Sequence, residues 1–525
     1  MKTLKMKLAA LLTAAAVCVS LAGCATGGAG SAAEKITDPY EKAERASYAY
    51  IAKSLGYVQK GNSFSIPDYD GHVEYTMSVQ PNGEALKSLL GSDVKFDPTV
   101  IKGAVDFVSK NGAVGDYYVN YDIGGYLTYA LWGKSDKYLF ALPSVDALKD
   151  VYYNYDVSSM GDIYKDAGLT AEVANTGEFS KVLGKDVTGA NAGALQELYV
   201  ATYTYLLAHP EVTNNVSEAL ASKYFNLVRG DAKKLEPAEK NVNVSIGDIS
   251  VVADKYTITI DTAFLRSLAA AAVDAVKSES GFNAEIQKTV DESGIKYADG
   301  SKFDVTEALG KVSEYVAKGD DTDSTGSFKM DVYIKDSSVV QREISSTDES
   351  NTGVLTIKTL VSGGKTEYDV LGTVNAETVR LKGTDTAEKG AHTGKFDFSV
   401  SSDSKNVTAT AEYKNISKTA DGEYNFVLPD YGVKISGTTS GEKKATADIS
   451  VGGQVYANVA FEITANTSPA KIPALPKTEK QFTDITESGE AILSDIVAKA
   501  TASDKNDIIA YFTKQYAPLL TGAAQ

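Results

Sequence analysis

Apolar and polar residues alternate along most of the second half of the chain. From Ser327 to Ile463 apolar residues occupy every second position of many short runs, most clearly in Phe328–Ile334, Phe396–Val400 and Ala457–Ile463. Turn-forming pairs such as Gly452-Gly453 separate the runs. A period of two places apolar side chains on one face of a strand. The pattern therefore predicts an antiparallel meander with one apolar and one wet face.

Two other regions have patterns of their own. Residues 72–142 contain short aromatic and β-branched runs interrupted by Gly124-Gly125, which predicts hairpins. Residues 190–320 place apolar residues three and four apart, which predicts a helical section, with strands inside 242–261.

Helix boundaries can be predicted at several points. Helices are expected over residues 38–55, 262–277 and 305–318, the last ending at Gly319. A further helix is expected around Asn215 and Glu218, which have capping-box spacing, with Gly230 as its end. Amphipathic spacing also predicts a C-terminal helical pair at 487–500 and 504–520.

These patterns predict an α+β fold in which a large, curved, half-barrel-like antiparallel sheet packs against a helical section. Strands with one apolar face need a cover, and the helices of 190–320 are available for it. The predicted division of the chain is a signal peptide at 1–23, a flexible tether at 24–37, an α+β domain at 38–345, a β-meander at 346–466, a Pro-rich connector at 467–480 and C-terminal helices at 481–525.

The N-terminus has the features of a secretory signal. Lys2, Lys5 and Lys7 precede an apolar run too short to span a membrane. The run ends in Leu21, Ala22, Gly23 and Cys24, which resemble the lipobox of bacterial lipoproteins. That resemblance implies cleavage before Cys24, a diacylglyceryl thioether and further acylation such as palmitate on Cys24, and a location on the extracytoplasmic face of the cell membrane.

Composition narrows the possible partners. The 525 residues carry a formal charge of −17, which becomes −20 once the three leader lysines are removed. An acidic body is repelled by nucleic acid and by anionic headgroups, so we expect the membrane contact to depend on the lipid anchor. Of the two cysteines, Cys18 leaves with the leader and Cys24 is acylated, which excludes thiol chemistry in the mature chain.

Catalytic and metal-binding patterns are missing from the sequence. His72, His209 and His392 lie in separate segments without metal-ligand spacing, the first in a predicted turn and the second at a predicted helix end. No GxSxG elbow occurs, and the acidic loop starting at Asp321 has Val332 where a calcium loop needs its bidentate Glu. We therefore expect no cofactor, no metal and no enzymatic activity.

Tyrosine is unevenly distributed. Ten of the 31 tyrosines lie between Tyr117 and Tyr164. They either form a binding platform with apolar faces and polar tips, or pack between half-buried strands. Tyr152, Tyr153 and Tyr155 are the candidate ligand-binding residues, because they are expected to leave the strand region for a loop.

The lipobox, the tether and the strand pair formed by Phe328–Lys335 and Val339–Ile344 together resemble large-sheet lipoproteins of Gram-positive bacteria, which are similar to the lipoprotein-carrier (LolA/LolB-like) superfamily. That resemblance implies a half-barrel sheet around helices and an apolar or amphipathic ligand such as a lipid. The leading hypothesis is thus a non-enzymatic binding or carrier protein. The alternatives are a transporter-associated solute-binding lipoprotein and a structural or adhesive module of the cell surface.

Overall fold

The structure is a computed structural model of the chain. It describes residues 36–54, 57–60, 63–90, 98–111, 113–125, 127–134, 137–144, 151–156, 182–190, 192–232, 234–319, 327–346, 353–375, 377–402, 405–474 and 481–484. The predicted signal peptide, the lipobox with Cys24 and the predicted C-terminal helical pair lie outside these residues.

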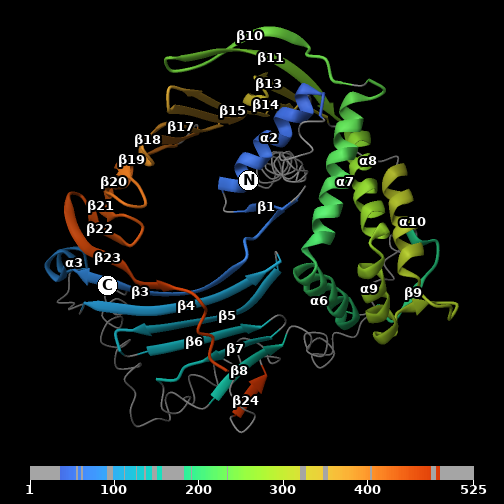
Figure 1. Cartoon of the computed structure of the whole chain (residues 1–525), viewed down its shortest axis with the longest axis horizontal. Helices are drawn as coiled ribbons and strands as arrows, with labels where there is room; N and C mark the ends of the chain where they lie inside the picture. The colour runs from blue at the N-terminus through green and yellow to red at the C-terminus, as the bar shows by residue number, and fades with distance from the viewer. Residues whose placement is uncertain are drawn as a thin grey trace.

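One 20-stranded sheet dominates the molecule. In Figure 1 it curves from β10 at the top, around the left side, to β8 and β24 at the bottom. Its strands, in spatial order, are β10 (Glu239–Ile246), β11 (Ile249–Ile260), β13 (Phe328–Lys335), β14 (Ser338–Ser346), β15 (Gly353–Ser362), β16 (Lys365–Val374), β17 (Glu377–Glu388), β18 (Ala391–Ser402), β19 (Lys405–Ile416), β20 (Asp421–Leu428), β21 (Val433–Ser440), β22 (Lys444–Val451), β23 (Gln454–Thr467), β3 (Tyr69–Pro81), β4 (Thr99–Lys110), β5 (Ala113–Ile123), β6 (Leu127–Lys134), β7 (Lys137–Ala141), β8 (Val151–Asp156) and β24 (Gln481–Asp484).

The pairing is antiparallel throughout except for the last strand. β3, from the start of the chain, pairs with β23, and this single ladder joins the early strands to the long meander. β24 pairs in parallel with β8 at the far edge. Residues 468–474, between β23 and β24, cross the sheet beside β3 and β4, where Ala470 and Lys471 donate backbone hydrogen bonds to Asp70 and Asp106. We call residues 468–474 the strap.

The helices cover one part of the sheet. They are α2 (Pro39–Ser54), α3 (Gly83–Leu90), α6 (Ala192–Ala208), α7 (Pro210–Arg229), α8 (Thr262–Ser278), α9 (Ser280–Glu292) and α10 (Val305–Lys318). Helix α2 lies inside the curve of the sheet, and α7 to α10 stand at its open side (Figure 1). Two two-stranded ladders, β1 (Val58–Lys60) with β2 (Ser63–Ser65) and β9 (Val187–Thr188) with β12 (Lys296–Tyr297), complete the fold with the 3₁₀ turn η3 (Pro429–Tyr431).

The main core lies at one end of the sheet. Three helices pack on β11, β13 and β14 there, through Tyr40 and Ala43 of α2, Tyr224 and Phe225 of α7 and Leu268 of α8. Val332 of β13 is fully buried beneath them. Each fully buried side chain of this kind contributes about 1.5–3 kcal/mol. A second cluster joins α6, α9 and α10 to the small β9–β12 ladder, so these helices pack mostly on one another.

Helix α2 is held in the curve by charged contacts. Asp38 accepts hydrogen bonds from the backbone N–H groups of Tyr40 and Leu235, which fixes the start of the helix against a distant segment. Buried Glu44 forms a two-pronged ion pair with Arg342 of β14, with nitrogen to oxygen distances of 2.8 and 2.7 Å. Arg45 makes a similar pair with Glu218 of α7.

The predicted fold class is confirmed, with a curved antiparallel meander in an α+β arrangement. The prediction of a capping box at Asn215 and Glu218 is wrong: α7 begins earlier, at Pro210, and both residues lie inside the helix. Proline is accommodated there because the first helical N–H has no partner within the helix. The boundary predicted between the α+β domain and the β-meander, at residues 345 and 346, does not divide the sheet, because β14 pairs with β15.

Candidate functional site

The candidate site is the face of the sheet that lines the inside of its curve. We call it the inner face and define it as the side on which Met330 and Val332 contact α2 and α7. Residues directly opposite each other in an antiparallel ladder share a face. The pairing register therefore extends the inner face from β13 through every following strand, for example through Val370, Leu381 and Phe398.

The inner face is apolar along its middle from β15 to β6. Successive strands place on it Ile357, Val370, Leu381, Phe398, Ala409, Phe426, Ile435, Ile449, Val459, Val79, Ile101, Ile123 and Leu127. At about 4.8 Å between strands, these thirteen strands span about 58 Å of arc. A single acyl chain spans about half of a 30 Å hydrocarbon core, so this face is several chain lengths long.

Much of this apolar surface is uncovered. Six large apolar side chains of the inner face are 36 to 65% exposed, and we call them the exposed patch: Val361, Val379, Leu381, Phe398, Phe426 and Phe461. They come from β15, whose Leu355 packs on the helical core, and from β17, β18, β20 and β23 beyond that core. Val379, Leu381 and Phe398 are neighbours on β17 and β18, whereas Val361 lies opposite Thr366, away from them along the sheet. Large apolar side chains exposed on one face are a feature of binding surfaces.

Aromatic rings continue the apolar surface beyond the exposed patch. Neighbouring rings are 4.8 to 6.0 Å apart in a file that we call the aromatic ladder: Phe461, Tyr75, Tyr121, Tyr129, Phe140 and Tyr153. Such separations are favourable for tilted and edge-on ring pairs. Burial and a hydrogen bond with Tyr121 raise the pKa of Tyr75, so this hydroxyl stays protonated at neutral pH.

Glycines on the inner face make room for the rings. A Cβ built on Gly103 would be 2.5 Å from the Tyr75 ring, and one on Gly383 would be 2.3 Å from the Phe396 ring. Each ring lies across the neighbouring strand and covers the space that the glycine leaves. Glycine kinks and covering aromatics are known means of curving a sheet. Gly133 and Gly394 are covered in the same way.

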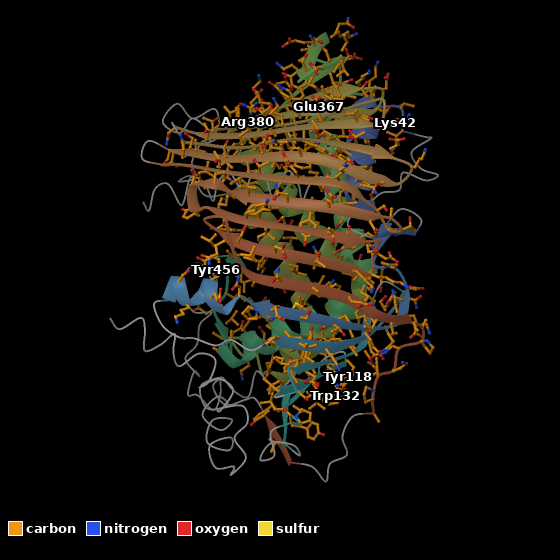
Figure 2. The ribbon with its side chains drawn as sticks, turned by 90° about the vertical axis from the view of Figure 1, so that its left-hand side faces the viewer. Lys42, Tyr118, Trp132, Glu367, Arg380 and Tyr456 are labelled. Atoms are coloured by element: carbon orange, nitrogen blue, oxygen red, sulfur yellow. The ribbon has the colours of Figure 1, made fainter. Side chains whose placement is uncertain are left out.

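Charged side chains of the early strands point to the opposite, outer face. In β3, β4 and β5 the register places Asp70, Glu74, Lys102, Asp106, Lys110, Asp116 and Asp122 there. Figure 2 shows the outer face, with Glu367 and Arg380 labelled on the later strands. Arg380 is paired with Asp369 at 2.8 Å. The sheet therefore separates an uncharged inner face on these strands from a charged outer face.

The predicted candidates Tyr152, Tyr153 and Tyr155 are not in a loop. All three lie in β8, and Tyr152 and Tyr153 are buried. Tyr152 packs on Trp132 of the outer face, while Tyr153 ends the aromatic ladder. Both faces of β8 are covered, so no alternation marks it as a strand. Tyr121 and Tyr129, which belong to the ten clustered tyrosines, and Tyr75, which does not, are half-buried on the inner face.

The three histidines lie in separate elements, and the prediction of a turn at His72 is wrong. His72 lies inside β3 and is buried, with ring nitrogens 2.8 Å from Asp106 and from Glu74. His209 precedes α7, as expected, and contacts Glu211. His392 contacts Asp385, which also accepts a hydrogen bond from Tyr413 at 2.8 Å.

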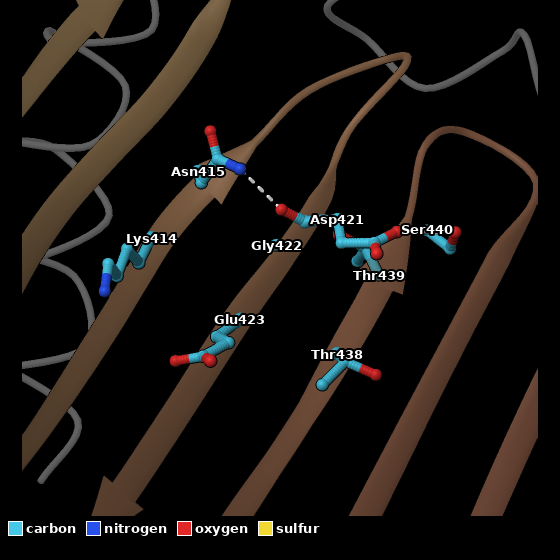
Figure 3. Close-up of a pocket in the computed structure, with 8 residues that line it drawn as sticks. All are labelled: Lys414, Asn415, Asp421, Gly422, Glu423, Thr438, Thr439 and Ser440. Carbon is cyan, nitrogen blue, oxygen red and sulfur yellow. Dashed lines mark hydrogen bonds between the residues drawn. The ribbon is translucent and has the colours of Figure 1, made fainter.

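Within the described ranges, no three His, Cys, Asp or Glu side chains are grouped for metal binding, and no helix is long and apolar enough to cross a bilayer. A polar pocket of about 450 Å³ opens between the ends of β19, β20 and β21, where Lys414, Glu423 and Thr438 belong to the outer face (Figure 3). Its polar lining contrasts with the inner face.

The chain matches no family model, no curated protein and no solved structure in the comparisons with known proteins.

Proposed function

We propose that the protein is a membrane-anchored extracytoplasmic lipoprotein that binds or carries an apolar or amphipathic ligand, without catalysis, on the inner face. The observation that carries this proposal is the exposed patch. Exposing large side chains such as Phe398 and Leu381 to water on one continuous face is unfavourable, and a ligand with an acyl chain would remove that cost.

The arrangement of helix and sheet supports the same proposal. A curved sheet with a helix inside its curve is what the resemblance to the lipoprotein-carrier superfamily implies. Among the described residues, the exposed patch lies largely beyond α2 and the helical core, and its side chains are open to solvent. The alternative of a solute-binding lipoprotein needs two lobes with alternating helices and strands. Residues 327–467 are instead an antiparallel meander wherever the structure describes them.

Anchoring is the second part of the proposal and rests on the lipobox. Cys24 would carry the lipid that holds the protein at the membrane, with the tether between the membrane and α2. Metabolic labelling with a palmitate analogue tests this part. We expect labelling of the full chain and loss of label and of membrane association in Cys24→Ala. Equal labelling of both chains would contradict it.

Ligand binding is tested with the full chain carrying Cys24→Ala, so that any recovered lipid is non-covalent. The purified protein is extracted with organic solvent, and the extract is analysed by mass spectrometry. We expect acyl-chain lipid in a fixed ratio to protein. Phe398→Glu places a carboxylate on the inner face and should reduce that ratio at least tenfold.

Ser399→Glu is the matched control, because it introduces the same carboxylate one residue further on the outer face, opposite Arg380. It should leave the lipid ratio unchanged. A parent protein free of lipid, or equal loss in both variants, would overturn the proposal of an inner-face binding site.

A further inference from the structure

The inner face has two stretches of different chemistry. From β15 to β22 its middle is formed by aliphatic side chains and phenylalanine, such as Val370, Leu381, Phe398 and Ile435. From β3 to β7 it gains the aromatic ladder, where Tyr75, Tyr121 and Tyr129 add hydroxyl groups to an apolar surface. Phe461 belongs to both the exposed patch and the ladder, so the two stretches meet at β23.

The aromatic stretch is polar without being charged. Every charged residue of β3, β4 and β5 lies on the outer face by register, and the inner positions hold Tyr, Phe, Val, Ile, Met, Gly, Ser, Thr and Pro. Burial raises the pKa of Tyr75 and of Tyr129, so both remain neutral hydroxyls at physiological pH. This surface can exchange hydrogen bonds and stack on a flat apolar face, and the described inner positions of β3, β4 and β5 carry no cation.

These features determine which headgroup fits. A phosphate desolvated on the described inner face of β3, β4 and β5 would lose water without gaining an Arg or Lys from these strands, which is strongly unfavourable. A sugar headgroup has an apolar ring face for stacking on tyrosine, and its hydroxyls can pair with tyrosine hydroxyls. The formal charge of −17 adds a general repulsion of anionic ligands.

We infer that the ligand is a lipid with an uncharged, hydroxyl-rich headgroup, of the glycosyl diacylglycerol class. Its acyl chains lie on the exposed patch and its headgroup lies on the aromatic ladder next to Tyr121 and Tyr129. This inference rests on the proposed function and specifies the ligand of the same inner face.

The test compares two lipids that differ only in the headgroup. Full chain carrying Cys24→Ala, stripped of lipid, is titrated in neutral detergent with glucosyl dioleoylglycerol and with dioleoylphosphatidylglycerol, and complexes are counted by native mass spectrometry. We expect at least tenfold tighter binding of the glucosyl lipid. Methyl glucoside in excess should not displace it, because the acyl chains are needed as well.

The outcomes separate the two proposals. If neither lipid binds and the solvent extract of the Cys24→Ala protein holds no lipid, the proposed function fails. If the extract holds lipid but neither of these two lipids binds, only the headgroup inference is overturned. If both lipids bind equally, or the phosphatidylglycerol binds more tightly, the function stands and the headgroup inference is overturned. Displacement by methyl glucoside alone would also overturn it, since the site would then recognise a free sugar.

A double variant locates the headgroup. Tyr121→Phe with Tyr129→Phe keeps both rings but removes two hydroxyls from the inner face. Binding of the glucosyl lipid should weaken about tenfold, while binding of the phosphatidylglycerol should not change. Tyr118→Phe removes a hydroxyl of the same strand from the outer face and is the control. Unchanged glucosyl-lipid binding in the double variant would contradict a headgroup at these tyrosines.

Discussion

The ring of Tyr75 on β3 lies over Gly103 on the neighbouring strand β4, and a Cβ at Gly103 would be only 2.5 Å from the ring. The missing side chain lets Tyr75 reach across β4 to Tyr121 of β5, with ring centres 5.9 Å apart. One glycine therefore makes the room that the aromatic ladder needs to continue across β4.

Gly103→Ala tests this relationship. The methyl group would force the Tyr75 ring off its position, and overpacking of this kind costs about 1–3 kcal/mol. Urea unfolding followed by the fluorescence of Trp132, the only tryptophan, measures the loss. Gly83→Ala in α3 is the control, because a Cβ there has no neighbour within 4 Å. Equal stability of the two variants would show that Tyr75 does not need the space.

The meander could be predicted because alternation is a local property. Phe328–Ile334 and Ala457–Ile463 lie in strands β13 and β23, as their period of two predicts. The ladder of β3 with β23 could not be predicted, since it joins residues 69–81 to residues 454–467 and no local pattern specifies that pairing.

The exposed patch could not be predicted from the sequence either. Alternation gives the same pattern for a face that is covered by helices and for one that is open, so Phe398 and Met330 cannot be distinguished by it. Strand β8 was not predicted because its sequence shows no alternation. Tyr152 packs on the outer face and Tyr153 on the inner face, and a strand apolar on both sides has no alternation.

The ion pair between Glu44 and Arg342 should be essential for the position of α2. Both side chains are largely buried, and Glu44→Gln would leave the Arg342 charge without its partner. Breaking a buried pair from one side costs about 3–5 kcal/mol. Exchanging both partners, as in Glu44→Leu with Arg342→Met, should recover most of this loss. Urea midpoints of the three proteins give the comparison, and a double variant less stable than the single one would contradict it.

Asp331 should make stability depend on pH in the acid range. Burial opposes its ionisation, but the hydrogen bond from Thr257 and the charges of Lys329 and Lys255 outweigh it and hold the pKa of Asp331 below its usual range. A carboxylate with a lowered folded pKa contributes stability that is present above its unfolded pKa of about 3.9 and is lost as the pH falls below it.

Urea midpoints between pH 2.5 and 6 measure this contribution. Thr257→Val removes the hydrogen-bond donor and brings the folded pKa of Asp331 closer to its unfolded value, so less stability should be lost between pH 6 and 2.5 than in the parent protein. Asp331→Asn should flatten this part of the acid slope. An unchanged slope in Asp331→Asn would assign the acid sensitivity to other carboxylates.

The strap depends on Asp106, a carboxylate that is only 1% exposed. Its Oδ1 accepts the backbone N–H of Lys471 and also faces the His72 ring at 2.8 Å, so one oxygen connects the strap to β3 and β4. Asp106→Ala would leave both groups without this acceptor, and an unsatisfied buried group costs about 1–3 kcal/mol. Residues 468–474 should then exchange amide hydrogens at least tenfold faster, as measured by mass spectrometry. Asp116→Asn, on the outer face of β5, should leave this exchange unchanged.

Because the strap leads to β24, which pairs with β8, the protection of β8 amides should also fall in Asp106→Ala. Faster exchange in the strap together with full protection of β8 would show that the β24 pairing does not depend on the strap.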